Sequence, residues 1–360
     1  MPERFDVAVV GAGPAGVSAA VHLTKLGFSV CLASDRECAS AARGETWSAR
    51  VAAEAGAVGL HLSTLSALTL PSAGLEAVWS SPSPTFASQI LDPLGPSRHV
   101  DRARIGAALR ELAIRAGVRV QLDSHFLNAV RGGSTWTVKF RGAAETTECS
   151  FLVDATGGAS SVAHAMGARR VRHDSLCGVS AVFTSTAPFR MLAVEATPYG
   201  WWYATPLLGD RVMACVMSDA DILQAMRAMT PRKWLSLFTQ TTFVSHLFGH
   251  NIVTIIPRVH ACATAMLDPV TGSGWLAVGD AASTFDPLSS AGVLKAFMSG
   301  REAATAVAKT LGGDVTALEG YTAHIENTFF AYLLLKKRHY EIQPRWRTEP
   351  FWSRRAKPMQ

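Results

Sequence analysis

The first 35 residues follow the hydrophobic pattern of a strand, a turn, a helix and a second strand. Residues 5–10 read FDVAVV, a continuous apolar run typical of a buried parallel strand. A glycine-rich turn follows at once, then apolar residues at helical spacing as far as Gly27, and a second apolar run at residues 29–33. This order predicts a βαβ unit of about 30 residues.

The same periodicities predict further elements along the chain. A helix is predicted over residues 100–117, with Asp101 as its N-cap. Residues 39–98 are rich in Ala, Ser, Pro and Gly, so we expect loops and short helices there. Strands are predicted at residues 118–122, 136–140, 151–155, 179–183, 201–205, 212–217 and 275–278, and helices at 231–247, 289–311 and 319–339.

The composition indicates a folded chain with room for about two domains. Of its 360 residues 48% are hydrophobic and only 17% are charged, which excludes a disordered chain. No run approaches the roughly 18 apolar residues of a membrane span, and the first residues lack the basic and apolar regions of a signal peptide. The six cysteines form no C-x-x-C pair and no cluster with histidine, so we expect a cytoplasmic protein without a metal site.

Positive charge is concentrated at the C-terminal end. Lys and Arg outnumber Asp and Glu by 34 to 28, and residues 336–357 alone hold eight Lys or Arg against two Glu. Such a basic tail can meet an acidic polypeptide, an anionic surface or a nucleic acid, and it can equally be a solvated chain end. The sequence leaves these interpretations open.

The turn after the first strand carries a motif with specific chemistry. Gly11, Gly13 and Gly16 form G-x-G-x-x-G between a strand and a helix, the context in which this motif binds a dinucleotide. Gly11 permits the tight turn, Gly13 lets the backbone approach a pyrophosphate, and Gly16 lets the helix pack on the strand. The acid that usually binds the ribose is displaced by one position, since Ser34 stands there and Asp35 follows.

Two later segments end strands with an aspartate. Residues 152–157 read LVDATG and residues 275–282 read WLAVGDAA, after which Pro287 and Gly292 precede a long helix. With the glycine motif, these segments resemble the flavoprotein monooxygenases of the p-hydroxybenzoate hydroxylase type and their halogenase relatives. The resemblance covers nearly the whole chain and implies that the dinucleotide is FAD.

The resemblance also assigns residues to FAD. Asp280 would bind a ribityl hydroxyl, the helix after Pro287 would direct its positive end at the flavin, and Arg102 matches an arginine at a helix start near FAD. The expected cofactor-binding residues are Gly11, Gly13, Ala15, Gly16, Ser34, Asp35, Arg43, Arg102, Asp154, Gly157, Gly279, Asp280, Pro287 and Gly292.

The fold implied by the resemblance is α/β. A discontinuous Rossmann-like FAD-binding domain would comprise residues 1–70, 98–172 and 258–312. An inserted antiparallel-sheet substrate domain would comprise residues 71–97 and 173–257, and residues 313–360 would form a C-terminal helix and the basic tail.

Two finer resemblances point to different branches of this superfamily. Residues 200–207 read GWWYATPL, similar to the W-x-W-x-I-P signature of the halogenases. Tryptophan halogenases also carry a lysine in the stretch after the glycine motif, and this chain has no lysine between Lys25 and Lys139, which argues against halogenation. The C-terminal residues 340–352 resemble the tail of flavoproteins that oxygenate tryptophan in proteins or ribosomal peptides, including those that mature lysine and glycine oxidases.

The resemblance therefore implies an FAD-dependent monooxygenase with O2 as co-substrate. A flavin C4a-hydroperoxide would hydroxylate an aromatic ring, and the indole of tryptophan in a peptide or protein is the preferred substrate. Trp201, Trp202 and Tyr203 are candidates to line the substrate pocket, or else to fill the core of the sheet. Glu45 and Glu195 are candidate bases, although either carboxylate could equally be exposed or salt-bridged.

Other interpretations remain open at this point. The chain could act on a free indole or phenol as a hydroxylase or halogenase, it could be a flavin-binding maturation chaperone without turnover, or it could reduce an isoprenoid double bond. Because the glycine motif occurs once, reduced flavin would come either directly from NAD(P)H or through a separate flavin reductase. We expect Lys295, on the long helix after Gly292, to have a capping or surface role, and we expect no nucleic-acid partner.

Overall fold

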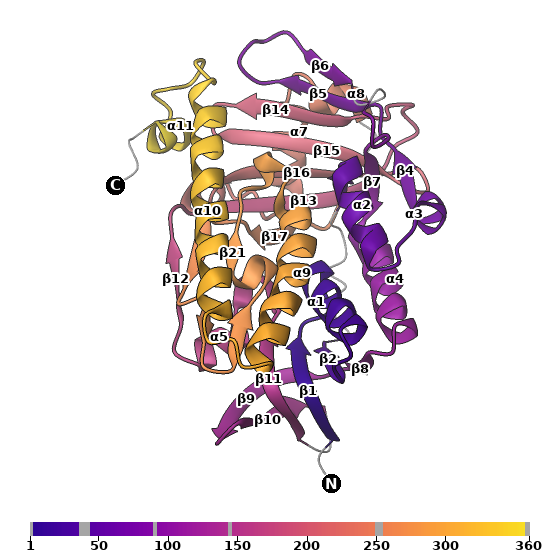
Figure 1. Ribbon diagram of the computed structural model, residues 1–360. Coiled ribbons are helices and arrows are strands. Elements are labelled where there is room, and N and C mark those ends of the chain that lie inside the picture. Colours follow the sequence, from indigo (N-terminus) through magenta and orange to yellow (C-terminus); the bar gives the residue numbers. More distant parts are fainter. Residues whose placement is uncertain (1–2, 36–43, 89–91, 143–145, 249–254, 357–360) are drawn as a thin grey trace.

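The structure is a computed structural model that describes residues 3–35, 44–88, 92–142, 146–248 and 255–356. Two sheets lie at opposite ends of the molecule in Figure 1, and the two longest helices run between them. The helices are α1 (Pro14–Lys25), α2 (Ala49–Ala57), α3 (Leu62–Leu68), α4 (Arg102–Arg115), α5 (Ser161–Ala165), α6 (Ala220–Ala225), α7 (Pro231–Thr239), α8 (Val244–Phe248), α9 (Gly292–Leu311), α10 (Ala317–Glu341) and α11 (Pro350–Arg355).

The first sheet contains the predicted βαβ unit. Its path is β19-β20-β11-β1-β2-β8, and the hairpin β9–β10 joins it through β11. β1 pairs in parallel with β2 and with β11, and β11 pairs in parallel with β20. The strands are β1 (Glu3–Val10), β2 (Val30–Ser34), β8 (Arg119–Leu122), β9 (His125–Gly132), β10 (Thr135–Arg141), β11 (Thr147–Asp154), β19 (Thr271–Gly272) and β20 (Trp275–Ala277).

The second sheet is almost wholly antiparallel and has the order β17-β13-β16-β15-β14-β5-β6. Only β5 runs parallel to its neighbour β14. The strands are β5 (Gly74–Val78), β6 (Thr85–Ser88), β13 (Leu176–Thr184), β14 (Leu192–Thr197), β15 (Gly200–Leu207), β16 (Arg211–Asp219) and β17 (Arg258–Ala261). Two three-stranded sheets complete the fold, one of β3 (Gly44–Trp47), β4 (Thr69–Pro71) and β7 (Arg98–Asp101), the other of β12 (Arg169–Arg172), β18 (Ala265–Asp268) and β21 (Ser283–Thr284).

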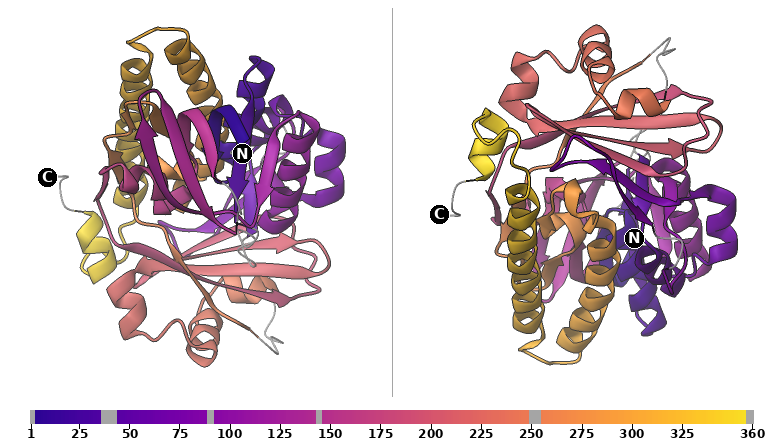
Figure 2. Two further views of the ribbon diagram at one scale, coloured as in Figure 1. Left: turned by 90° about the horizontal axis from the view of Figure 1, so that it is seen from below. Right: turned by 90° about the horizontal axis from the view of Figure 1, so that it is seen from above.

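The two large sheets have separate cores, and the second sheet packs on both faces. Successive side chains of a strand point to opposite faces. Trp202 therefore joins Trp234 and Phe238 in one apolar cluster, on the face covered by α7 and α8, whereas Trp201 joins a cluster with the C-terminal Tyr340. The two further views in Figure 2 show the C-terminal segment beside this second sheet.

The predicted fold class, an α/β flavin fold with an antiparallel sheet and a C-terminal helical segment, is confirmed. The predicted domain boundaries stay a prediction. Within the described residues, no helix has both the length and the apolar character that crossing a membrane requires.

Three local predictions were wrong. Residues 39–98 contain strands as well as helices, since β5 and β6 extend the second sheet at its edge. Residues 231–247 form two helices, because the Glu195 carboxylate accepts backbone N–H bonds from Thr242, Phe243 and Val244 and so starts α8 after a break. The long helix begins at Gly292, because Asp286 caps a short 3-10 turn just before it.

The basic tail is not a solvated end where the structure describes it. Phe351 and Trp352 of α11 are buried. Arg355 forms an ion pair with Asp219 at 2.7 Å, and Arg354 bonds to Asp219 at 2.8 Å. These pairs join the end of the chain to β16, so much of its positive charge is used within the molecule.

Candidate active site

Two glycines of the motif pack so closely against the backbone that no side chain would fit. Gly11 has a φ of +112°, and a Cβ placed on it would lie 2.2 Å from the carbonyl oxygen of Ala155. A Cβ on Gly16 would lie 1.9 Å from the carbonyl oxygen of Gly11. Gly13 differs, because a Cβ there would meet nothing within 4 Å. Gly13 is the N-cap of α1 and no side chain caps it, so the helix presents its first N–H groups to open space.

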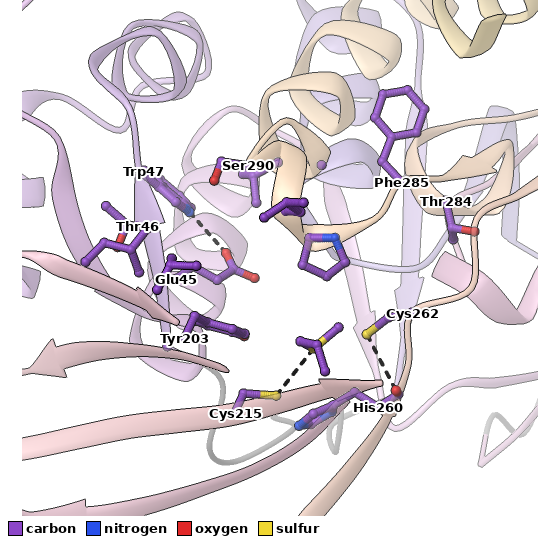
Figure 3. A pocket seen from close by; sticks show the side chains of 18 of the residues that line it. Glu45, Thr46, Trp47, Tyr203, Cys215, His260, Cys262, Thr284, Phe285 and Ser290 are labelled. Carbon is purple, nitrogen blue, oxygen red and sulfur yellow. Dashed lines mark hydrogen bonds between the residues drawn. The ribbon is translucent and has the colours of Figure 1, made fainter. Parts of the chain in front are cut away.

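A cavity of about 510 Å³ begins at this open space and ends against the second sheet. Its volume lies within the range of about 300–1,000 Å³ that is usual for ligand sites. Figure 3 shows Tyr203 and Cys215 on the second sheet, across the cavity from Ser290 near the start of α9. The predicted residues that line it are Gly13, Ala15, Glu45, Arg102, Gly157, Trp201, Tyr203, Asp280, Pro287 and Gly292.

Asp280 is held at the cavity by a buried cation. The Lys295 Nζ lies 3.0 Å from Asp280 Oδ1 and also donates to the carbonyl of Ser283. Burial would raise the pKa of the Asp280 carboxyl, but the neighbouring Lys295 holds it below its ordinary value. The Asp280 side chain is 49% exposed, and in the described part of the chain no residue donates to its Oδ2. A charged carboxylate with one oxygen available for a hydroxyl is thereby presented to the cavity.

Lys295 itself differs from the expectation. Its side chain is only 7% exposed, so a surface role is excluded. Burial lowers the pKa of Lys295, while the ion pair with Asp280 acts in the opposite direction. Arg170 holds the same segment, residues 280–284, because it donates to the Asp280 carbonyl and to Thr284 Oγ1, each at 2.9 Å. Neither cation belongs to a motif, so sequence reasoning missed their roles.

The N-terminus of α9 also faces the cavity. Gly292 begins this helix of 20 residues, and no side chain caps it. Ser290, Gly292 and Val293 line the cavity beside Pro287. The partial positive charge of the helix end is therefore directed at whatever the cavity holds.

Glu45 and Arg102 form an ion pair at the cavity wall. Arg102 Nη1 donates to Glu45 Oε1, and Trp47 Nε1 donates to Glu45 Oε2 at 3.1 Å. The predicted base is thus held by two donors. In this arrangement Glu45 orients Arg102 and Trp47 along the cavity.

The opposite wall is a stripe of apolar and aromatic side chains on one face of the second sheet. Trp201 and Tyr203 of β15 pair across the strands with Met217 and Cys215 of β16, and all four line the cavity. The rings of Trp201 and Tyr203 have centroids 5.8 Å apart, and Trp79 lies 6.3 Å from Trp201. Such a wall suits a flat aromatic ligand.

Three residues predicted near the ligand lie elsewhere. Trp202 points to the opposite core, for the reason of strand alternation given above. Glu195 does not line the cavity and is a buried cap for α8. Asp154 is buried, and its carboxylate accepts bonds from Thr156 N at 2.9 Å and Ala163 N at 2.8 Å, so it orders the turn after β11 and does not face the cavity.

The remaining predicted cofactor residues are distributed as follows. Gly11, Gly16 and Gly279 lie behind the cavity wall, where they allow close packing. Ser34 is buried at the end of β2, and Asp35 is exposed and bonds to His125 Nδ1 at 2.7 Å; neither lines the cavity. Arg43 lies outside the described residues.

Sequence reasoning also missed Cys215, Met217 and Trp79 as cavity residues. Cys215 and Met217 could have been predicted, because they are two positions apart on a strand, as Trp201 and Tyr203 are. Residues directly opposite one another on adjacent antiparallel strands point to the same face of the sheet. Trp79 follows β5, a strand that we did not predict because its region is rich in Ala, Ser, Pro and Gly.

A family model described as "FAD binding domain" matches residues 4–327 of the chain. The chain belongs to this family. FAD is therefore its cofactor, and it is an FAD-dependent oxidoreductase of the monooxygenase type.

Similar proteins match over nearly the full length of this flavoprotein. It is 26% identical to an FAD-dependent oxidoreductase called LodB from Marinomonas mediterranea, over 98% of this chain and 97% of that protein. It is 24% identical to a tryptophan 2-halogenase from Chondromyces crocatus, over 98% of this chain and 71% of that protein. A solved structure of the peptidyl tryptophan dihydroxylase QhpG superposes with a TM-score of 0.84 at 25% identity, covering 99% of this chain and 80% of QhpG.

The residues present fit FAD. Gly13 and Ala15 each bring a backbone N–H to the start of α1, with space beside Gly13 for a pyrophosphate. Asp280 offers an acceptor for a sugar-alcohol hydroxyl, and Gly292 offers a positive helix end. Among the described residues, no group of three or more metal-ligating side chains could hold a metal ion.

Proposed function

We propose that this flavoprotein hydroxylates the indole ring of a tryptophan within a peptide or protein. The observation that carries the proposal is the continuity of one cavity from Gly13, Asp280 and Gly292 to the aromatic wall of Trp201 and Tyr203. An aromatic ring seated on that wall would face the flavin end of the same cavity.

The roles of the chain's residues follow from their positions. Gly13, Gly157, Asp280, Pro287 and Gly292 would hold FAD. Bound FAD, once reduced, supplies the activation of O2 for the transfer of one oxygen atom to an electron-rich ring. The apolar wall excludes water from the reacting atoms and fixes the orientation of the ring, which is what an oxygen transfer of this kind needs from the protein.

A polypeptide substrate is supported by the rim of the cavity. Four exposed residues line the cavity at its edge: Ser80 from the turn after β5, Thr85 at the start of β6, and His339 and Ile342 at the end of α10. Ile342 is 58% exposed, so this edge of the cavity offers both an apolar side chain and polar ones to a polypeptide. The full-length similarity to QhpG, a protein whose name states that it acts on peptidyl tryptophan, supports the same substrate class.

Halogenation of a free aromatic is the second candidate, and the similarity to a tryptophan 2-halogenase favours it. Against it, no lysine is among the described residues that line the cavity. Arg102 is the arginine among the described lining residues, and it forms an ion pair with Glu45. We therefore prefer direct oxygen transfer.

The test is a mass-spectrometric assay with purified protein, FAD, NADH, a flavin reductase, bromide and ¹⁸O2. The substrates compared are N-acetyl-tryptophanamide, a tryptophan-containing tripeptide, free L-tryptophan and phenol. We expect ¹⁸O on the tripeptide and the blocked amino acid. Bromine on any substrate, or oxygen on free small aromatics alone, would overturn the proposal, and Asp280→Ala protein is the matched control without bound flavin.

A further inference from the structure

Tyr340, near the end of α10, connects the two walls of the cavity through its hydroxyl group. Trp201 Nε1 donates to the Tyr340 oxygen at 3.2 Å, and the Tyr340 hydroxyl donates to Asp286 Oδ2 at 2.7 Å. Trp201 belongs to the substrate wall, and Asp286 precedes the residues Pro287–Ser289 at the flavin end. One buried hydroxyl thus joins two regions that are far apart in sequence.

Asp286 sets the shape of the loop that enters α9. Its side chain is buried, and its Oδ1 accepts the backbone N–H of Leu288 at 2.9 Å. Its own backbone N–H donates to the hydroxyl of Tyr332, also on α10, at 2.6 Å. Pro287, Leu288 and Ser290 line the cavity, so the position of Asp286 decides where this part of the wall lies.

The protonation of Tyr340 suits a permanent link. Burial, followed by the nearby Asp286 carboxylate, raises the pKa of Tyr340 well above its ordinary value. The hydroxyl therefore keeps its proton, donates to Asp286 and accepts from Trp201. The Arg355 guanidinium lies over the ring, 5.2 Å from its centroid, and adds a cation–π contact.

We propose that Tyr340 is a positioning residue that couples the aromatic substrate wall at Trp201 to the flavin-side loop at Asp286. Through this link, the orientation of Trp201 sets the geometry of residues 285–291, and the two sides of the cavity are kept in register. The inference deepens the proposed function, because register between substrate ring and flavin is what an oxygen transfer requires.

The first experiment uses no substrate. Hydrogen exchange of residues 285–291 is measured in the FAD-loaded protein for the wild type, Tyr340→Phe, Trp201→Phe and the double variant. Tyr340→Phe keeps the ring and leaves the Asp286 oxygen without its donor, so we expect exchange to rise roughly tenfold. Trp201→Phe should raise it by a smaller factor, and the double variant should exchange no faster than Tyr340→Phe, because both changes break one chain of bonds.

Tyr321→Phe is the matched control. Tyr321 is a buried tyrosine of the same helix, and its hydroxyl donates to the Ala277 carbonyl at 2.8 Å, outside the cavity wall. Its loss should leave exchange at residues 285–291 unchanged. The coupling is contradicted if Trp201→Phe leaves the loop unaffected, if the two single effects multiply in the double variant, or if Tyr321→Phe loosens the loop as much as Tyr340→Phe does.

The second experiment measures the consequence for oxygen use. With N-acetyl-tryptophanamide as probe, Tyr340→Phe should retain FAD and form several times more hydrogen peroxide per oxygenated product than the wild type. An unchanged ratio would overturn the coupling. If no protein oxygenates the probe, the proposed function fails, while the exchange experiment still decides whether Tyr340 couples the walls.

Discussion

The two ends of the cavity are built from opposite kinds of residue. The flavin end consists of glycines and a carboxylate–cation pair, and its contacts involve backbone atoms packed too closely for a side chain. The substrate end consists of large side chains, with Trp201 and Tyr203 on one strand and Trp79 beside them. At the first end Gly11 and Gly16 leave no room for a side chain, whereas the second end depends on which face of a strand each side chain occupies.

The largest effect is expected at Gly16. In Gly16→Ala the new Cβ would lie 1.9 Å from the Gly11 carbonyl oxygen, so α1 must move away from β1. We expect destabilisation of at least about 3 kcal/mol and no recoverable FAD-loaded protein, because overpacking against backbone cannot relax. Thermal unfolding of the purified protein and its flavin absorbance measure this.

Gly13→Ala is the matched change in the same motif. Gly13 has a φ of −76°, which any residue adopts, and open space where the Cβ would lie. Its apoprotein should unfold at the wild-type temperature, while FAD binds at least roughly tenfold more weakly, because the methyl group takes the space of the pyrophosphate. Wild-type FAD affinity in Gly13→Ala would show that the open space beside Gly13 has no bearing on the cofactor, and a stability loss equal to that of Gly16→Ala would show that the space is not open.

The next largest effect is expected at Asp280. Asp280→Ala removes the acceptor at the cavity and leaves the buried ammonium of Lys295 without its carboxylate. FAD and activity should be lost together, with affinity reduced about a hundredfold or more, as measured by flavin retention on gel filtration and by titration of the apoprotein. Tightly retained FAD in this variant would contradict the assignment of Asp280 to the cofactor.

The difference between the two ends explains what could be predicted from the sequence. The glycine motif could be recognised from the sequence because its residues lie within a short stretch, Gly11 to Gly16, although Gly11 also packs against the distant Ala155 and Thr156. The role of Lys295 was not readable, since a buried lysine is recognised only once its carboxylate partner is placed beside it.

At the substrate end, the sequence identified the aromatic residues but not the face of the sheet to which each of them points. The sequence alone cannot distinguish Trp201 from Trp202, since both are tryptophans of the same strand. The pairing with β16 and the packing of α7 and α8 decide which of them faces the cavity. The C-terminal segment was still less readable. Arg355 bonds to Asp219, which is 136 positions away in the sequence, and no local pattern predicts such a pair.

A pair of substitutions on β15 tests the substrate end directly. Trp201→Phe should leave FAD binding intact and lower turnover roughly tenfold to a hundredfold, because the ring at the wall loses its shape and its bond to Tyr340. Trp202→Phe removes a bond to the Tyr199 hydroxyl in the opposite core, so it should lower stability by about 1–2 kcal/mol and spare turnover per folded enzyme. Steady-state kinetics and urea unfolding of both proteins distinguish these results, and equal kinetic effects would refute the assignment of faces.

The smallest effect is expected at His99, where β7 contacts the second sheet. His99 of β7 is buried, and its Nε2 lies 3.1 Å from the Arg190 carbonyl while its Nδ1 lies 2.8 Å from Thr205 Oγ1. A carbonyl oxygen only accepts, so Nε2 carries the proton and Nδ1 accepts from the hydroxyl. This arrangement requires the neutral ring, and burial lowers the pKa of His99 to about 4.

The sign of the pH effect follows from that shift. The pKa of an unfolded histidine is about 6.5. Between this value and the folded pKa of about 4, the unfolded chain binds a proton that the folded chain does not. Stability is therefore full above the unfolded value and decreases as the pH falls, by about 1 kcal/mol at pH 6, until the loss ends near the folded value. In His99→Gln this contribution is absent, so the stability difference between wild type and variant should narrow by about that amount from pH 8 to pH 6 in urea unfolding. A difference that stays constant with pH would mean that the contact between β7 and the second sheet does not depend on a neutral His99.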